Sequence, residues 1–537
     1  MSLSGKFFKS KIKKKPSTQN LQSDVEIEKE KEKQNTSNQK LQPSLEENLK
    51  QLKQELGESS DIVYRTIQLT GKREILVSVI YIDGLGDSRS IQQFILESLS
   101  QRCEQKLQQS PEDDEFKIIK DFSITIGEIK TTQKMEDVAK AVLSGDSVVL
   151  VDRYSEGIIT GTRGWEDRGV TEPTSETIVR GPKDGFSETL RMNTSLIRRR
   201  VKDGKLRIES KNVGSITKTD LAIVYIEGIV DPKVVEEVHS RIDKIEIDAI
   251  LESGYIEELI QDETYTPFPT IYSTERPDVI VAGILEGRVG IIVDGTPFAL
   301  LVPAIFTQFF QASEDYYQRA DFSSLIRILR FGSFLLTLLV PSSYIAVTTF
   351  HQEMLPTRLL ISLAAAREGV PFPALVEVLI MEITFEILRE AGVRLPKAVG
   401  SAISIVGALV IGEAAVQAGL VSSAMVIVVS FTAITSFVIP SYNFTLAVRM
   451  MRFVYIFLAA TFGLYGIILG LIALVLHLCS LRSFGVPYME AFGPFNFQDQ
   501  KDSIFRFPMK NLLTRPKLIG NKNKSRQQQP DQYQQKK

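Results

Sequence analysis

Four long apolar segments in the second half of the chain restrict its fold more than any other feature. They cover residues 326–348, 398–418, 421–439 and 453–478 of the 537-residue sequence. A helix needs about 20 mainly apolar residues to cross the hydrocarbon core of a lipid bilayer, and all four segments are near or above this length. The sequence therefore predicts a bundle of four transmembrane helices, the first of them kinked at Pro341.

The side of the membrane on which basic residues would lie supports four crossings for one segment and argues against four crossings for another. Four crossings return the Lys-rich segment 481–537 to the cytosolic side as a C-terminal tail, and Lys and Arg are enriched on that side of membranes. The same count places Arg449 and Arg452 on the opposite side, against this tendency.

Two other parts of this half are predicted to lie at the membrane surface. The run TPFALLVPAIFTQFFQA (296–312) is short and interrupted by proline, so residues 296–350 are predicted to hold a re-entrant or interfacial piece followed by the first span. Residues 351–397 are predicted to form amphipathic interfacial helices, and residues 398–480 to form the remaining spans.

The first half of the chain is rich in charged residues and starts without the apolar core of a secretory signal, so it is predicted to stay in the cytosol. Residues 1–56 are mostly Lys, Glu, Gln, Asn and Ser, and we expect a disordered tail because such a segment buries too little apolar surface to offset the entropy of ordering. Over the whole chain 63 Lys and Arg nearly balance 65 Asp and Glu, which argues against a nucleic-acid partner.

An internal repeat organises the rest of this half. VIYIDGLGD (79–87) matches IVYIEGIVD (223–231), and AVLSGDSVVLVD (141–152) matches AGILEGRVGIIVD (282–294) at nearly the same offset. Each copy contains β-branched runs that end in an acidic residue or glycine, which is typical of buried strands. The sequence predicts an α+β multidomain membrane protein, in which two related cytosolic α/β subdomains precede an α-helical transmembrane bundle. The subdomains are predicted at 57–152 and 205–295.

The Arg-rich segment 153–204 between the two repeats is predicted to be a linker or extended arm, because Gly and Pro interrupt its first part. Its acidic residues nearly cancel its arginines. Mixed charge of this kind favours ion pairing at a domain or subunit interface, while an intramolecular linker that joins the repeats is an equal alternative. The candidate interface residues are Arg163, Trp165, Glu166, Asp167, Arg168 and Arg180.

Three carboxylates within MEITFEILRE (381–390) share one stripe of a predicted amphipathic helix. At about 100° per residue, Glu382, Glu386 and Glu390 fall on the same side. Acidic side chains are costly in lipid, so we expect this stripe to face water at the interface, an ion-access vestibule, or basic partners. A dicarboxylate metal site would need a histidine three residues after a glutamate, and the sequence has none there.

The predicted span 398–418 has two contrasting faces. One face consists of small residues, which let neighbouring helices approach closely: Ser401, Ser404, Ala408, Gly412 and Ala415. The other face has the composition of a pore lining, with an apolar band that gates by dewetting and a carboxylate that favours cations: Ile403, Val406, Val410, Glu413 and Gln417. The alternative is that Glu413 forms hydrogen bonds inside the bundle or lies at its wet end.

Sequence motifs of common enzyme classes are missing. The chain has neither a Walker lysine loop, nor H-E-x-x-H, nor a G-x-S-x-G elbow, nor paired C-x-x-C motifs. We therefore expect neither enzymatic activity nor a cofactor or metal ion.

Four long motifs carry a resemblance to a known family: GTRGWEDRGVTEPTSETIVRGPKDGF, GVPFPALVEVLIMEITFEILREAGVRLP, VGSAISIVGALVIGEAAVQAGLV and IPSYNFTLAVRMMRF. With them, the chain resembles the GerA-type spore germinant receptor A subunits from about residue 60 to residue 500. The resemblance implies a protein of the spore inner membrane that works with a transporter-like B subunit, which binds the nutrient, and with a lipoprotein C subunit. It also implies a homo-oligomeric ring, expected to be a pentamer, that acts as a nutrient-gated ion channel.

Three other functions share parts of this pattern. An A-like subunit associated with the dipicolinate-release channel has the same motifs, so the sequence separates it poorly from a nutrient receptor. A secondary transporter would place its repeat among the membrane helices, whereas the repeat found here lies in the charged half. A membrane scaffold that conducts no ions is the third alternative.

Overall fold

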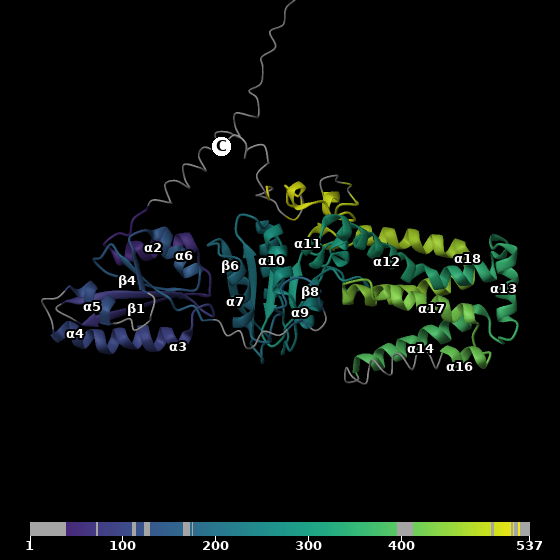
Figure 1. Cartoon of the computed structure of the whole chain (residues 1–537), viewed down its shortest axis with the longest axis horizontal. Helices are drawn as coiled ribbons and strands as arrows, with labels where there is room; N and C mark the ends of the chain where they lie inside the picture. Colours follow the sequence, from purple (N-terminus) through teal and green to yellow (C-terminus); the bar gives the residue numbers. More distant parts are fainter. Residues whose placement is uncertain are drawn as a thin grey trace, which may run out of the picture. The chain divides into compact units, whose positions relative to one another are not determined.

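The computed structural model describes residues 39–70, 73–109, 114–122, 129–164, 172–173, 176–394, 412–493, 495, 499–516, 519 and 525–526 (Figure 1). The chain forms two compact units. The first contains Met1–Trp165 with Lys202–Gly204, and the second contains Glu166–Val201 with Lys205–Lys537.

The first unit is built on a five-stranded antiparallel sheet with the order β1-β2-β4-β5-β3. The strands are β1 (Ile62–Thr70), β2 (Glu74–Ile82), β3 (Ile129–Thr132), β4 (Ser147–Val151) and β5 (Gly157–Thr160). The helical segments are α2 (Leu45–Leu56), α3 (Ser88–Ser90), η1 (Ile91–Leu96), η2 (Ser98–Cys103), α4 (Glu104–Gln109), α5 (Glu115–Phe122) and α6 (Met135–Leu143).

Helices cover both faces of this sheet because successive side chains of a strand point to opposite faces. In β2, Val77 and Val79 belong to a core shared with the helical segments of residues 91–119, whereas Ile80 and Ile82 belong to a second core shared with α2 and α6. The unit is therefore a three-layer structure.

The second unit begins with a sheet of the same design, ordered β6-β7-β9-β10-β8 and also antiparallel. Its strands are β6 (Leu206–Val213), β7 (Thr219–Ile226), β8 (Tyr272–Thr274), β9 (Val289–Val293) and β10 (Ala299–Val302). Its helices are α7 (Leu190–Arg200), α8 (Pro232–Asp243), α9 (Ser253–Ile260) and α10 (Pro277–Glu286). The shared strand order agrees with the two related subdomains predicted from the sequence.

The repeat begins earlier than its sequence motifs suggest. Asn48 in α2 accepts a hydrogen bond from Gln42 N (2.8 Å) and donates one to Gln42 O (2.6 Å). Asn193 in α7 makes the same two bonds with Ser187 (2.7 and 2.6 Å). Each subdomain therefore includes the helix that precedes its first strand, held by a buried asparagine.

This arrangement corrects two predicted boundaries. The predicted disordered tail 1–56 contains α2, and the predicted linker 153–204 contains α7. α2 is mostly charged, but its leucines recur on one side and are buried against the sheet (Leu45, Leu52 and Leu56). An amphipathic face of this kind stabilises a helix whose average composition is polar.

The predicted re-entrant or interfacial piece at 296–312 is also wrong. β10 pairs with both β8 and β9 inside the second sheet, and the following 3-10 helix η4 (Phe306–Phe310) is buried. Phe306 and Phe310 pack against other buried rings, among them Phe334 and Phe444. The run is apolar because it fills a protein core, which excludes water as the interior of a membrane does.

The remainder of the second unit is mainly helical: α11 (Glu314–Tyr317), α12 (Ala320–Thr349), η5 (Gln352–Met354), α13 (Thr357–Arg367), α14 (Ala374–Arg394), α16 (Gly412–Gln417), α17 (Ser423–Ser436), α18 (Tyr442–Ser480), η7 (Asp499–Asp502) and η8 (Met509–Asn511). The short strands β11 (Arg482–Ser483) and β12 (Val486–Pro487) follow α18. α12 and α18 lie side by side (Figure 1). One continuous apolar core joins these two helices to one face of the second sheet.

Two described helices, α12 and α18, are long and apolar enough to cross a membrane. They contain the predicted spans 326–348 and 453–478. α17, in the predicted span 421–439, is apolar but has 14 residues. Most of the predicted span 398–418 lies outside the described residues, and its last part forms α16.

α18 is interrupted at Gly463, which has φ 61° and ψ −142°. His351 accepts a hydrogen bond from the next amide, Leu464 N, through Nε2 (3.3 Å). A continuous helix of 39 residues would be about 58 Å long. This is longer than the hydrocarbon core of a bilayer, about 30 Å, so the break divides a helix that is longer than one crossing needs.

We predict that Gly463→Ala lowers the free energy of unfolding by about 1–3 kcal/mol, because only glycine adopts this backbone conformation without strain. The new Cβ would also lie 2.9 Å from His351 Nε2 and 3.1 Å from Phe350 Cβ. Thermal unfolding of the detergent-purified chain measures the effect. Gly332→Ala in α12 is the matched control, because a Cβ added at Gly332 would meet no neighbouring group within 4 Å; equal stability of the two variants would contradict the prediction.

Candidate functional site

The acidic stripe of α14 lies against arginines of α18. Arg452 Nη2 lies 2.7 Å from Glu382 Oε2 and 3.0 Å from Glu386 Oε1. Arg449 forms an ion pair with the same Glu386 carboxylate, to which its Nε donates at 3.0 Å. The network therefore joins two helices that are far apart in the sequence.

The three acids, expected to face water, a vestibule or basic partners, differ in their surroundings. Glu382 is fully buried, Glu386 is half-buried, and Glu390 is exposed beside Arg394 of the next helical turn. Glu382 therefore faces neither water nor a vestibule in this structure; it faces a basic residue, which is the third of the expected surroundings. A buried carboxylate is tolerated when it is paired with a cation, and Arg452 supplies that cation.

Sequence reasoning missed these partners, although the spacing of the basic residues contained a signal. Arg449 and Arg452 are three residues apart, so they occupy one face of α18 just as the acids occupy one face of α14. The sequence placed both arginines on the side of the membrane where basic residues are less common. Each of them forms an ion pair with an acid of the same chain, so their charges are neutralised locally.

The ion pairs leave part of the network without hydrogen bonds. Glu382 Oε1 and Arg452 Nε and Nη1 are buried, and none has a hydrogen-bond partner among the described residues. The Glu382–Arg452 contact is short enough for an ion pair, but its geometry is not that of a hydrogen bond. A half-satisfied polar network is costly, so the closed contact of α14 with α18 is less stable than complete bonding would make it.

A further acid secures the start of α14. Glu377 is fully buried, accepts a hydrogen bond from Arg367 Nε (3.2 Å) and accepts another from Ser422 N (3.1 Å). Arg367 belongs to α13 and Ser422 caps α17. The acids of α14 thus connect it to three neighbouring helices.

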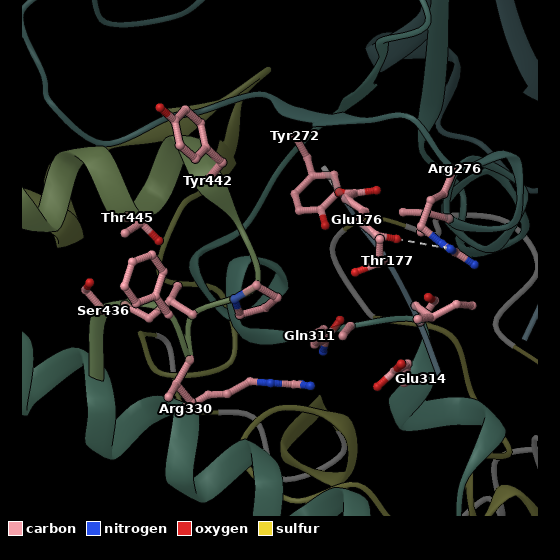
Figure 2. Close-up of a pocket in the computed structure, with 18 of the residues that line it drawn as sticks. Glu176, Thr177, Tyr272, Arg276, Gln311, Glu314, Arg330, Ser436, Tyr442 and Thr445 are labelled. Carbon is pink, nitrogen blue, oxygen red and sulfur yellow. Dashed lines mark hydrogen bonds between the residues drawn. The ribbon is translucent and has the colours of Figure 1, made fainter. Parts of the chain in front are cut away.

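A cavity of about 360 Å³ lies where the second sheet meets the helices, all within the second unit (Figure 2). Its labelled residues come from the segment 176–177, the region of β8 and α10, the α11 region, α12, the end of α17 and the start of α18. Glu314 and Ser436 lie on opposite sides of it in the figure. The cavity is therefore bordered by several elements of the second unit.

The lining near the second sheet is held by Arg276. Its guanidinium donates to Glu176 O (3.3 Å), Pro182 O (2.9 Å) and Asp278 Oδ2 (2.8 Å). Burial raises the pKa of Glu176 to about 7, although a hydrogen bond from Thr274 opposes this rise. These contacts hold residues 176–182, which lie within the predicted arm 153–204, on the second sheet.

The predicted pore and packing faces are described only at their ends. Glu413 and Gln417 are exposed in this chain, and Gln417 Nε2 donates to Glu413 Oε1 (3.2 Å). Gly412 is buried and Ala415 is half-buried. The other predicted residues of both faces, Ser401, Ile403, Ser404, Val406, Ala408 and Val410, lie outside the described residues.

The predicted interface residues are likewise described in part. Arg163 forms a two-pronged contact with Asp146 in the first unit, with Nε and Nη2 at 2.8 and 2.7 Å from the carboxylate oxygens. Arg180 is exposed. Trp165, Glu166, Asp167 and Arg168 lie outside the described residues.

Comparison with known proteins gives matches along most of the chain. A sequence model of the family described as Bacillus/Clostridium GerA spore germination protein matches residues 50–518. Spore germination protein KA of Bacillus subtilis (strain 168) is 49% identical over 487 residues, which is 91% of this chain and 89% of that protein. Spore germination protein GerLA of Bacillus cereus is 40% identical over 483 residues, 90% and 97% of the two chains.

A solved structure gives a further match. The crystal structure of the N-terminal domain of the A subunit of the Bacillus megaterium spore germinant receptor GerK3 is 37% identical, with a TM-score of 0.40, and the match covers 50% of this chain and 98% of that one. The family model and the relatives at 40–49% identity decide the assignment. The chain belongs to the GerA family of spore germination proteins.

Proposed function

We propose that this chain is the A subunit of a nutrient germinant receptor in the spore inner membrane, with its N-terminal unit in the cytosol. The observation that carries the proposal is the family match over residues 50–518. The family and the two long apolar helices indicate association with a membrane. Its partners in this proposal are a transporter-like B subunit, a lipoprotein C subunit and further copies of the chain in a pentameric ring.

The proposed activity is a cation channel that opens when a partner subunit binds nutrient, and the chain catalyses no reaction. Support comes from the charged contact between α14 and α18. Its buried polar atoms are incompletely bonded, so the closed arrangement is separated from alternatives by a small free-energy difference. A partner that favours one arrangement then shifts the population towards it.

We predict that Glu413→Ala reduces or alters the release of cations from spores after nutrient is added, because a ring of these carboxylates attracts cations. Val406→Ala and Val410→Ala are expected to cause spontaneous release, because smaller side chains weaken an apolar gate. Flame photometry of the spore supernatant measures release, and immunoblotting verifies normal protein levels.

Glu353→Ala is the control, since this exposed acid lies on η5, outside the proposed pore. Unchanged release in all three pore variants would contradict the proposed pore face. Normal cation release combined with altered dipicolinate release would instead favour the subunit associated with the dipicolinate channel.

A further inference from the structure

The charged cluster between α14 and α18 contains one more cation than it contains acids. Arg449 and Arg452 pair with Glu382 and Glu386. Arg389, one turn beyond Glu386, lies within electrostatic range of Glu382 and Arg452. Among the described residues, no carboxylate lies within ion-pairing distance of Arg389, so one positive charge is uncompensated.

Arg389 is held firmly in spite of this. Its Nη2 donates to Ser436 Oγ (2.8 Å), and its guanidinium lies 5.0 Å from the ring centroid of Phe385 and 4.9 Å from that of Phe437. Guanidinium groups bind aromatic rings in this way without losing their charge. A guanidinium has five N–H donors. Among the described residues, Arg389 donates one hydrogen bond, to Ser436, so it is held in place while its other donors are unused.

This guanidinium lines the 360 Å³ cavity, together with other arginines that are already neutralised. Arg330 Nη1 lies 2.9 Å from both Asp315 oxygens, Arg276 pairs with Asp278, and Arg449 pairs with Glu386. Arg389 is therefore the arginine of this lining that has no carboxylate partner among the described residues.

The hydroxyls near this charge already donate to the backbone, Ser436 Oγ to Ala433 O (2.7 Å) and Thr445 Oγ1 to Ser441 O (2.8 Å), so the donors that remain for an anion are those of Arg389. Ser436, Tyr442 and Thr445 lie together on one side of the cavity, and Glu314 lies on the opposite side (Figure 2). Glu314 accepts a hydrogen bond from Val179 N (2.5 Å), and burial raises the pKa of Glu176 to about 7, which reduces the negative charge of that carboxyl near neutral pH.

We propose that this cavity binds a small oxyanion, whose carboxylate or phosphate oxygens are held by the unused N–H donors of Arg389, next to Ser436 and Thr445. A planar guanidinium matches two oxygens of such a group, and the volume lies within the range of small-molecule sites. The oxyanion comes either from a soluble metabolite or from a lipid headgroup, because the chemistry that Arg389 recognises is the same. This site goes beyond the proposed cation path, because it gives the chain a ligand of its own.

Binding at this position would add to the contacts that already join α14 to α17 and to α18. The anion would neutralise the excess charge of α14 while contacting α17 through Ser436 and α18 through Thr445. Its occupancy would therefore stabilise the closed contact between α14 and α18, which makes the site a point of regulation.

The test measures oxyanion binding to the full-length chain in two arms. In detergent, inorganic phosphate or acetate is titrated while the unfolding temperature is recorded; in lipid nanodiscs, phosphatidylglycerol is compared with phosphatidylcholine. Arg389→Gln is expected to weaken binding at least tenfold. Arg394→Gln is the matched control on the same helix, since Arg394 is exposed and paired with Glu390, and it should leave binding unchanged.

Ser436→Asp tests the site without removing the arginine. The new carboxylate would pair with Arg389 and replace the external anion, so binding should be lost while the chain becomes more stable without ligand. Ser423→Asp, which adds the same charge at an exposed position of the same helix, should retain binding. Stabilisation by phosphate or acetate indicates a soluble ligand, and stabilisation by phosphatidylglycerol alone indicates a headgroup. Equal responses of Arg389→Gln and Arg394→Gln in both arms, or no response of the wild-type chain in either, would overturn the proposal.

Discussion

Replacing Arg452 with alanine is expected to lower the free energy of unfolding by about 3–5 kcal/mol, the usual cost of removing one partner of a buried ion pair. Both Arg452 and Glu382 are fully buried, so the remaining carboxylate would lose its ion-pair partner without gaining access to water. The effect is measured by thermal or denaturant unfolding of the detergent-purified chain.

Two further variants separate the ion pair from simple packing. Arg394→Ala removes an exposed pair with Glu390, and such pairs contribute at most about 1 kcal/mol. Glu382→Met combined with Arg452→Leu should recover most of the lost stability, because an apolar pair carries no desolvation penalty. If Arg452→Ala is no more destabilising than Arg394→Ala, the buried network has no structural role.

Asp315→Ala is expected to destabilise the chain by a similar amount, about 3–5 kcal/mol, because one carboxylate neutralises two buried arginines. Asp315 accepts hydrogen bonds from Arg327 Nε (2.8 Å) and from Arg330 Nη1 (2.9 Å). Arg327 is fully buried and keeps one other acid, Asp502, whereas Arg330 has no other acid among the described residues. The same unfolding measurement detects the loss.

Asp321→Ala is the control for this prediction. Asp321 is also close to the start of α12 and is paired with an arginine, Arg319, but both side chains are exposed. A change below about 1 kcal/mol is expected. Equal effects of the two substitutions would show that the arginines of α12 do not depend on Asp315.

The sequence predicted the repeat because buried strands leave a strong local pattern. The matched runs at 79–87 and 223–231 correspond to β2 and β7, which take the same place in two sheets of identical order. The sequence did not place α2 and α7 in the two repeats, because the residues that these helices share are few. A buried asparagine at 48 and 193 is invisible to a search for apolar runs.

The apolar run at 296–312 shows where hydropathy fails. Composition cannot separate a strand in the centre of a sheet from a segment in lipid, because both environments exclude water. The length of the run argued correctly against a complete span, but the interfacial assignment had no means of detecting the neighbouring strands β8 and β9.

The acidic stripe of α14 was predicted half correctly. Helical periodicity placed Glu382 and Glu386 on one side, and basic partners were among the expected surroundings. Which basic residues those are depends on how α14 packs against α18, and the order of residues along the chain does not determine such packing. The cavity beside Arg389 was missed for the same reason, since its lining comes from segments scattered between residues 176 and 449.

The central claim is that this chain forms a cation path lined by Glu413. The most direct test is the reversal potential of its conductance in a planar bilayer under a potassium chloride gradient, recorded with the partner subunits and nutrient present. The account predicts a reversal potential close to the equilibrium potential of potassium. In Glu413→Lys, the reversal potential should shift towards the equilibrium potential of chloride. A nutrient-independent conductance, or the same reversal potential in both proteins, would contradict it.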